Sequence, residues 1–195
     1  MYDYTCGSGG FNRPLRGYNG SWSNFEGIGK VDLDAEGRTG AIKEMTSLIN
    51  KSSYDIDIWL QRGVETSQGA AKFLDIPESA LKSQSTLENL LIKGGKKEIT
   101  DPGFVSCGSA KGQGFSGYIF NSYCPKGTKM MYAEPFSAYG RGSDLNWDGI
   151  AKQAGFGHED ETIIQRGTTF RVIKVEEKGN STYFDLEVVS RITGR

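Results

Sequence analysis

Two glutamates, one residue apart, stand just ahead of an apolar run near the C-terminus. The segment GHEDETIIQRGTTFRV, residues 157–172, contains Glu159, Glu161 and the only histidine of the chain, His158. In an extended strand alternate side chains share a face, so the two carboxylates would lie on one side, ~7 Å apart. This spacing suits two carboxylates that act on one substrate. A solvated acidic turn before a strand is the alternative interpretation.

The sequence before this pair predicts a helix and then a strand. Apolar residues recur at helical spacing at Ile42, Met45, Leu48 and Ile49. Residues 54–61 alternate apolar and polar side chains, as a half-buried strand does. Arg62 continues the apolar parity of this strand, and a guanidinium on the core-facing side would need an anion. Alternatively, Arg62 lies beyond the strand end and is solvated.

The rest of the chain predicts a β-rich domain. The 27 glycines against 5 prolines indicate many turns. A second helical region is expected over residues 76–94, and strands are expected around a turn at 125–128 and in a closing hairpin with its turn at 178–180. We therefore expect one α/β (α+β) domain over 1–195, with a helical part over about 1–53 and a β-rich core over about 54–195.

Composition excludes several classes of function. The formal net charge of -1 gives no basic excess for nucleic acid, and no apolar run is long enough to span a bilayer. Cys6, Cys107 and Cys124 form no C-x-x-C pair and the chain has a single histidine, so we expect no metal site. The first residues lack the pattern of a secretory signal peptide.

Five segments, in order, resemble a known enzyme family. They include Arg62, then Ser106 at the end of a predicted strand, and then the Glu159–Glu161 pair. The segments are YTCGSGGFNRPLRG, IWLQRGV, ITDPGFVSCGS, CPKGTKMMYAEPFSAYG and EDETIIQRGTTFRV. With these motifs the chain resembles the mono-ADP-ribosyltransferase toxins of the Arg-Ser-Glu class, such as the enzymatic components of clostridial binary toxins and the vegetative insecticidal toxins. The resemblance covers nearly the whole chain.

The resemblance implies NAD as the substrate that supplies ADP-ribose, without a metal. A planar guanidinium binds phosphate oxygens with two hydrogen bonds, which suits Arg62 to the pyrophosphate. Cleavage of the bond between nicotinamide and ribose develops positive charge on the sugar, which a carboxylate stabilises. By the resemblance that carboxylate belongs to Glu161, and Ser106 orients it. Asn12 and Gly63 complete the NAD-binding residues that the resemblance implies.

The same resemblance gives Glu159 to the acceptor. In the family a glutamate at this position goes with arginine, and a glutamine goes with asparagine-type acceptors. A guanidinium has a pKa above ~12, so its attack is helped by a carboxylate that binds it and takes its proton. Phe156 is expected to touch the protein target, with a packing role as the alternative. His158 is expected to be an ordinary loop residue.

The chain departs from the family pattern at two places. Cys107 and Gly108 stand where the family has Thr and Ser, which shape the nicotinamide pocket. Gly63 stands where binary toxins often carry a second arginine. One phosphate contact is therefore missing or comes from Arg13 or Arg16.

We therefore expect an NAD-dependent mono-ADP-ribosyltransferase that modifies an arginine of a protein target, with actin as the leading candidate by analogy. The expected fold has two packed, mainly antiparallel β-sheets flanked by N-terminal helices, with NAD in the cleft between the sheets. An NAD glycohydrolase and a catalytically inactive binding module are the alternatives. We expect a secreted or delivered bacterial toxin or effector domain that acts in the target-cell cytoplasm, and a delivery or immunity protein could be a further partner.

Overall fold

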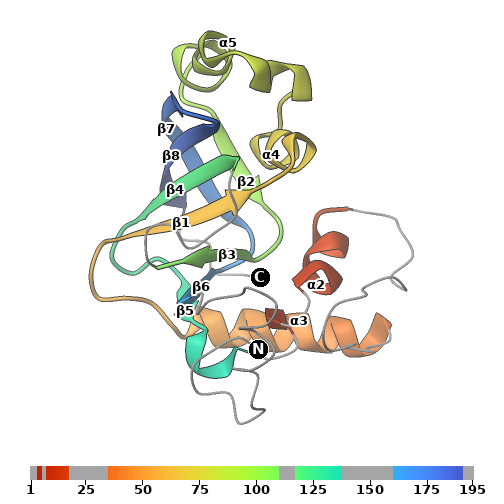
Figure 1. Ribbon diagram of the computed structural model, residues 1–195. Helices are drawn as coiled ribbons and strands as arrows, with labels where there is room; N and C mark the ends of the chain where they lie inside the picture. Colours follow the sequence, from red (N-terminus) through yellow and green to blue (C-terminus); the bar gives the residue numbers. More distant parts are fainter. Residues whose placement is uncertain (1–3, 6–7, 18–34, 110–116, 138–159, 191–195) are drawn as a thin grey trace.

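The computed structural model describes residues 4–5, 8–17, 35–109, 117–137 and 160–190. Within these ranges eight strands form one sheet in the order β2-β7-β8-β4-β1-β3-β6-β5 (Figure 1). The strands are β1 (Ile58–Val64), β2 (Glu98–Asp101), β3 (Val105–Gly108), β4 (Tyr118–Cys124), β5 (Met130–Tyr132), β6 (Glu161–Ile164), β7 (Thr168–Lys178) and β8 (Ser181–Ser190). Neighbouring strands are antiparallel except β4 and β8, which are parallel.

The sheet consists of two groups of strands that meet at one point. β2, β7, β8, β4 and β1 form one group, and β3, β6 and β5 form the other. β1 joins β3 through a single Cα pair, Gln61 and Gly108, because only the last residue of the short strand β3 reaches β1. The expected mainly antiparallel α+β fold is confirmed. The expectation of two separate sheets is corrected, since this pair makes the two groups one continuous sheet.

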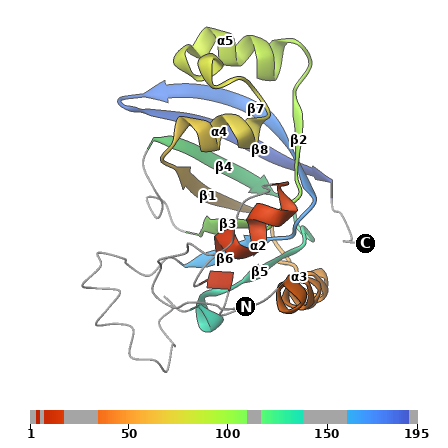
Figure 2. The ribbon, with the colours of Figure 1, turned by 90° about the vertical axis from the view of Figure 1, so that its right-hand side faces the viewer.

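The helices gather at the two ends of the sheet. They are α2 (Ser8–Leu15), α3 (Ala35–Asn50), α4 (Ser67–Leu74), the 3-10 turn η1 (Glu78–Lys82), α5 (Gln84–Glu88), the π turn η2 (Asn89–Lys93) and the 3-10 turn η3 (Glu134–Phe136). α2 and α3 lie near β3, β6 and β5, whereas α4 and α5 lie near the other group of strands (Figures 1 and 2). No helix in the described ranges is long and apolar enough to cross a membrane.

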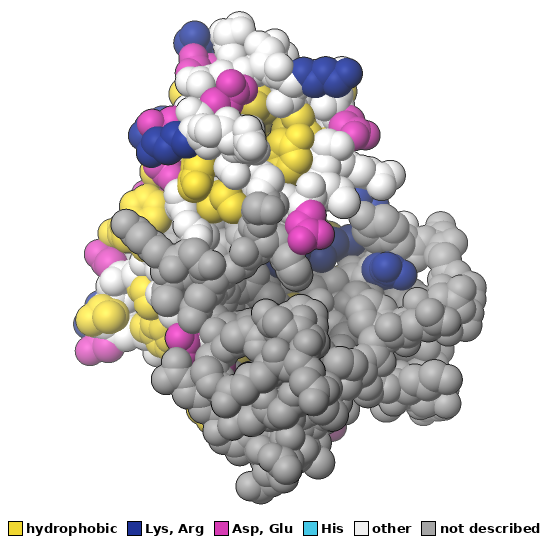
Figure 3. Space-filling model, in the orientation of Figure 1, with side chains coloured by type: hydrophobic (Ala, Val, Ile, Leu, Met, Phe, Trp, Pro, Cys, Tyr) yellow, Lys and Arg dark blue, Asp and Glu magenta, His cyan; other side chains and the backbone are white. Residues whose placement is uncertain are grey.

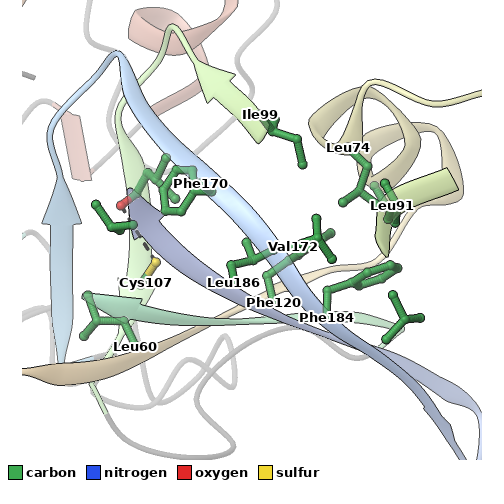
Figure 4. Close-up of a cluster of buried hydrophobic side chains, with 14 of the residues drawn as sticks. Leu60, Leu74, Leu91, Ile99, Cys107, Phe120, Phe170, Val172, Phe184 and Leu186 are labelled. Carbon is green, nitrogen blue, oxygen red and sulfur yellow. Dashed lines mark hydrogen bonds between the residues drawn. The ribbon is translucent and has the colours of Figure 1, made fainter. Parts of the chain in front are cut away.

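Two hydrophobic clusters fill the space between sheet and helices. The larger one packs α4 and η2 against the long strands and includes Leu60, Phe120, Phe170 and Phe184 (Figure 4). The smaller cluster packs α2 and α3 against β6 and the residue just before β3, and consists of Tyr4, Phe11, Met45, Ile49, Phe104, Ala133 and Ile163. The helical pattern predicted for α3 is thus confirmed at Met45 and Ile49. Leu48 instead turns to solvent with 44% of its surface exposed.

The Gln-Arg-Gly-Thr turn between β6 and β7 fastens α3 to the sheet. Gln165 Nε2 donates to the carbonyl of Thr46 at 2.8 Å, and Arg166 Nε donates to Thr46 Oγ1 at 2.9 Å. Gly167 has a φ of 74°, which favours glycine, and its N–H donates to the carbonyl of Asp101 at 2.7 Å. The Arg-Gly-Thr motif, which the sequence shows only as part of a resemblance, therefore holds α3 against the sheet.

Of the two turns expected from sequence, one forms a hairpin and one does not. β7 and β8 pair as an antiparallel hairpin through Gly179, whose φ is 59°. The turn at 125–128 also forms, with Thr128 Oγ1 donating to the carbonyl of Pro125 at 2.6 Å. However, β4 pairs with β1 and β8, whereas β5 pairs with β6. This turn therefore carries the chain from one strand group to the other.

Candidate active site

Arg62 lies inside β1 rather than beyond its end. The strand continues to Val64 and pairs with β4 over its whole length. The side chain is half-buried, and its Nη1 donates to the carbonyl of Ser106 at 3.3 Å. In the described part of the chain this is its one hydrogen bond, and a guanidinium has several N–H donors. The remaining donors are suited to an anion such as a phosphate.

Ser106 lies in the middle of β3, next to the buried phenol of Tyr4. Ser106 Oγ and Tyr4 Oη are 3.0 Å apart. Tyr4 is 0% exposed and packs edge-on against the rings of Phe11 and Phe104, with centroids 5.6 Å away in both cases. The expected orienting serine is therefore held from behind by a residue of the N-terminal segment.

Asn12 faces the protein interior instead of an open site. It is 4% exposed, and its Oδ1 accepts from the Phe104 N–H at 2.8 Å. Its Nδ2 donates to the Phe104 carbonyl at 3.1 Å and to Tyr4 Oη at 3.0 Å. A Cβ added at Gly103 would lie 2.9 Å from both Asn12 Oδ1 and Arg16 Nε, so a larger residue here would displace these side chains. Asn12 thus ties α2 to the start of β3, which is an indirect way to support an NAD site.

Glu161 opens β6 and is only 6% exposed. Its Cα partner on β3 is Gly108, which is also the Cα partner of Gln61 on β1, the residue before Arg62. Because paired strands lie ~5 Å apart, the three neighbouring strands bring Arg62, Ser106 and Glu161 within the span of one ligand. The structure therefore brings together the three residues that the sequence singled out.

The second carboxylate and its neighbours lie outside the described residues. This applies to Glu159, Phe156 and His158. Asp160, between the two glutamates, has a φ of 42°. The assumption of an extended Glu-x-Glu segment is therefore wrong at its middle residue, because this φ belongs to the left-handed region. The Asp160 side chain accepts a hydrogen bond from Tyr132 Oη at 3.2 Å.

The charges of Glu161 and Arg62 affect the pKa of side chains on both faces of β3. Burial raises the pKa of Tyr4 to about 12, and the Glu161 carboxylate adds to this rise whereas the Arg62 charge opposes it. Burial also raises the pKa of the Cys107 thiol to about 12, and the same two charges act on it in the same directions. Cys107, which stands where the family has Thr, fills the larger hydrophobic cluster and remains a neutral thiol.

The two candidates for a second phosphate contact differ in their partners. Arg16 makes a bidentate ion pair with Asp101, with Nε to Oδ1 at 2.9 Å and Nη2 to Oδ2 at 2.8 Å, and it also donates to the Phe104 carbonyl. Arg13, in contrast, is exposed on α2. Arg13 is therefore the better candidate. Gly63 is buried within β1, beside Arg62.

Sequence reasoning missed two residues that hold this site. Tyr4 is part of the aromatic-Thr segment that carries the resemblance, but nothing local shows that its hydroxyl meets Ser106. Asp101 precedes Pro102 and resembles a turn residue, and its pairing partner is 85 residues away along the chain. The described residues contain no group of three or more His, Cys, Asp or Glu that could hold a metal ion.

Comparison with known proteins places this chain in a family. The model of the ADP-ribosyltransferase exoenzyme family matches residues 1–190. No curated protein sequence matches the chain. Among solved structures, C3stau2 from S. aureus with NAD has a TM-score of 0.69 at 19% identity, covering 96% of this chain and 83% of that chain.

Two further structures share the fold. An ADP-ribosyltransferase from Clostridium botulinum has a TM-score of 0.64 at 18% identity, covering 95% of this chain and 82% of that chain. BECa, an ADP-ribosylating toxin of a binary enterotoxin of C. perfringens solved with NADH, has a TM-score of 0.60 at 16% identity, covering 96% of this chain and 42% of that chain. The family match and the shared fold agree. The chain belongs to the ADP-ribosyltransferase exoenzyme family, whose members are mono-ADP-ribosyltransferase toxins.

Proposed function

We propose that this chain cleaves NAD and transfers ADP-ribose to an arginine of a protein target, as the single catalytic domain of a secreted or delivered bacterial toxin. The observation that supports this most directly is the placement of Arg62, Ser106 and Glu161 on three neighbouring strands, with Arg62 bonded to the Ser106 carbonyl. Relatives of similar fold were solved with NAD and with NADH, which supports a dinucleotide as the ligand.

NAD binding depends on Arg62. Its half-buried guanidinium keeps N–H donors for the pyrophosphate, and the bond to the Ser106 carbonyl fixes its direction. Arg13 supplies a second positive charge from α2, because Arg16 is already paired with Asp101. Gly63, which is buried within β1 beside Arg62, belongs to the same NAD-binding set by the resemblance described above.

Bond cleavage depends on Glu161. The bond between the ribose carbon and the nicotinamide nitrogen breaks, its electron pair leaves with nicotinamide, and the sugar becomes positively charged. A carboxylate that is 6% exposed acts through a medium of low dielectric constant, where it stabilises this charge more strongly than in water. Ser106 orients the carboxylate from the adjacent strand.

Transfer depends on Glu159. A target arginine attacks the sugar through one guanidinium nitrogen, forming the new carbon–nitrogen bond, and Glu159 accepts the proton that this nitrogen loses. A glutamate at this position favours arginine over an asparagine-type acceptor, by the resemblance described above. Phe156 is the residue of the same loop that we assign to contact with the target.

The partner is a protein, with actin as the leading candidate. The chain has a formal net charge of -1. On the face of the molecule that Figure 3 shows, acidic and basic side chains are intermixed over the described residues. Neither feature favours nucleic acid. The arginine acceptor therefore belongs to a folded protein surface or an exposed protein segment.

Replacement of Glu159 by Gln tests this assignment. The amide is nearly isosteric but cannot take a proton, so labelling of protein arginine should stop while water still hydrolyses NAD. We would measure nicotinamide release and labelling of lysate proteins from labelled NAD side by side, with Glu161→Gln as the control that loses both. Mass spectrometry of the labelled proteins would identify the target and the modified residue.

Each result has a distinct meaning. Loss of hydrolysis together with transfer would give Glu159 to the glycosidic chemistry and favour an NAD glycohydrolase. Unchanged activities would leave the acidic segment as a solvated turn. Labelling of asparagine instead of arginine would overturn the acceptor assignment, and a wild-type protein without nicotinamide release would be a binding module.

A further inference from the structure

A chain of hydrogen bonds runs from α2 to the hydroxyl of Ser106. Asn12 Nδ2 lies 3.0 Å from Tyr4 Oη, and Tyr4 Oη lies 3.0 Å from Ser106 Oγ. Tyr4 is 0% exposed and Asn12 is 4% exposed, so bulk water does not compete for these bonds. Tyr4 is also too deeply buried to touch a substrate, so any role in catalysis must act through Ser106.

The donor and acceptor groups fix the direction of the hydrogen bonds from Asn12 to Ser106. The amide nitrogen of Asn12 can only donate, so Tyr4 Oη accepts from it. The phenol keeps its proton because its pKa is raised to about 12, mainly by burial. Of its two acceptors, the Phe104 carbonyl is 3.5 Å away and already receives bonds from Asn12 and Arg16, each at 3.1 Å. The Tyr4 hydrogen is therefore donated to Ser106 Oγ at 3.0 Å.

The register of β3 and β6 places Ser106 and Glu161 on the same side of the sheet. Ser106 pairs with Ile163 and Gly108 pairs with Glu161 on the antiparallel strands β3 and β6. Paired residues share a face, so Ser106, Ile163 and Glu161 project to the same side of the sheet. Diagonal neighbours of this kind have Cβ atoms ~7 Å apart, within the combined reach of a hydroxyl and a glutamate. Ile163 packs in the same cluster as Tyr4, which identifies the side.

We propose that Tyr4 is a positioning residue that, by donating to Ser106 Oγ, leaves the Ser106 hydrogen for the carboxylate of Glu161. This inference rests on the proposed function, because it assigns Tyr4 to the same cleavage step. A free serine hydroxyl rotates among staggered positions, and the phenol removes those in which its hydrogen points back into the protein. The N-terminal segment thus completes the active site without meeting the substrate.

Replacement of Tyr4 by Phe tests the proposal. This change keeps the ring that packs against Phe11 and Phe104 and removes only the hydroxyl. We expect kcat for nicotinamide release to fall about 5- to 10-fold, the loss typical of one hydrogen bond, while KM for NAD changes less than about twofold. In a Ser106→Ala background the same replacement should have no further effect on kcat, because its only route of action is gone.

Two further variants separate positioning from loss of stability. Asn12→Asp replaces the donor by an acceptor, which draws the Tyr4 hydrogen away from Ser106, so kcat should fall to a similar extent. Ile49→Val removes a methyl group from the same buried cluster without touching the hydrogen bonds. It should lower Tm at least as much as Tyr4→Phe does and leave kcat unchanged.

The outcomes distinguish the inference from the function beneath it. If wild-type protein releases no nicotinamide, the proposed function fails and the inference fails with it. If wild type is active, unchanged kcat in Tyr4→Phe overturns the inference alone. Full additivity with Ser106→Ala, or an equal loss of kcat in Ile49→Val, also overturns it, because either result would show a general structural effect. If Tyr4→Phe does not fold, Asn12→Asp decides by the same criteria.

Discussion

Glu161 and Arg62 carry opposite charges on the two strands that flank β3. Glu161 is almost fully buried and Arg62 is half-buried, and both charges act on Tyr4 and on Cys107. The cleavage that we propose would act mainly through electrostatics, because these groups are fixed before the substrate arrives. The consequences of removing each charge are therefore separable.

Replacement of Glu161 by Gln should abolish both NAD hydrolysis and transfer. The amide has nearly the same shape but lacks the negative charge that stabilises the sugar cation, so the rate should fall ~100-fold or more. Nicotinamide release and protein labelling would measure this loss, and thermal unfolding would check that the protein is folded. Residual activity within a few-fold of the wild type would refute the assignment.

Replacement of Arg62 by Lys should weaken the binding of NAD. An ammonium keeps the charge but cannot form two parallel hydrogen bonds to phosphate, so we expect affinity to fall about tenfold or more. Isothermal titration calorimetry of the variant with NAD would measure the change. Arg13→Lys, on the exposed side of α2, is the matched control and should lose less. Equal affinity in Arg62→Lys and wild type would remove Arg62 from the binding site.

At the scale of elements, β3 is the strand that joins the proposed active site to the hydrophobic packing. Val105 and Cys107 point into the larger hydrophobic cluster, and Ser106 points toward Tyr4 in the smaller one. The segment just before β3 is held by α2 through Asn12 and through the ion pair of Arg16 with Asp101. The position of Ser106 therefore depends on a helix that is distant in sequence.

Replacement of Asp101 by Asn should weaken the link between α2 and the segment before β3. The Asp101 side chain is 3% exposed and binds Arg16 in bidentate fashion, so the change should cost about 2–4 kcal/mol of unfolding free energy. Glu98→Gln, on the same strand, breaks the exposed pair with Arg171 and should cost about 0–1 kcal/mol. Urea unfolding would compare the two variants, and equal losses would contradict the anchoring role of Asp101.

Hydrophobic periodicity predicts those helices and strands whose own local sequence determines their structure. The apolar alternation before Arg62 predicts β1, the helical spacing predicts α3, and Gly179 marks the turn of the closing hairpin. Helix α4 escaped prediction because its sequence SQGAAKFL includes a glycine, although Thr66 caps it by accepting from the Gly69 N–H at 3.1 Å. Weak local signals of this kind are decided by packing.

The candidate site could be proposed from the sequence as a set of residue types, but the hydrogen bonds that hold these residues could not. Arg62, Ser106 and Glu161 are recognisable from motifs, whereas the bond between Tyr4 and Ser106 joins residues 102 positions apart. No local pattern predicts such a contact. The strand order is also hard to predict, because β4 lies beside β8 in the sheet rather than beside β5, and this pairing joins strands that are distant in sequence.

At the scale of the whole molecule, the larger hydrophobic cluster crosses the junction between the two strand groups. It includes Ile164 of β6 and Met130 of β5. It also includes Cys107 of β3, together with Leu60 and Phe120 from the other group (Figure 4). The backbone link between the groups is a single Cα pair, so side-chain packing must supply most of the coupling. We therefore expect one cooperative folding unit.

The two buried thiols in the described part of the chain test this expectation, since they lie on opposite sides of the junction. Cys107 is on β3 and Cys124 is on β4. Burial raises the pKa of Cys107 to about 12 and raises that of Cys124 as well. Only the thiolate reacts readily, so alkylation at pH 8 should require unfolding.

In a urea series, iodoacetamide labelling of Cys107 and Cys124, read peptide by peptide in the mass spectrometer, should rise at one midpoint that coincides with the loss of tryptophan fluorescence. Labelling of Cys107 at lower urea than Cys124 would mean that β3, β6 and β5 open first. Because Cys107 follows Ser106 directly, such local opening would also displace Ser106, which we propose orients Glu161, while the long strands stayed folded. NAD cleavage should then disappear at the Cys107 midpoint, whereas a single folding unit loses labelling protection and activity together.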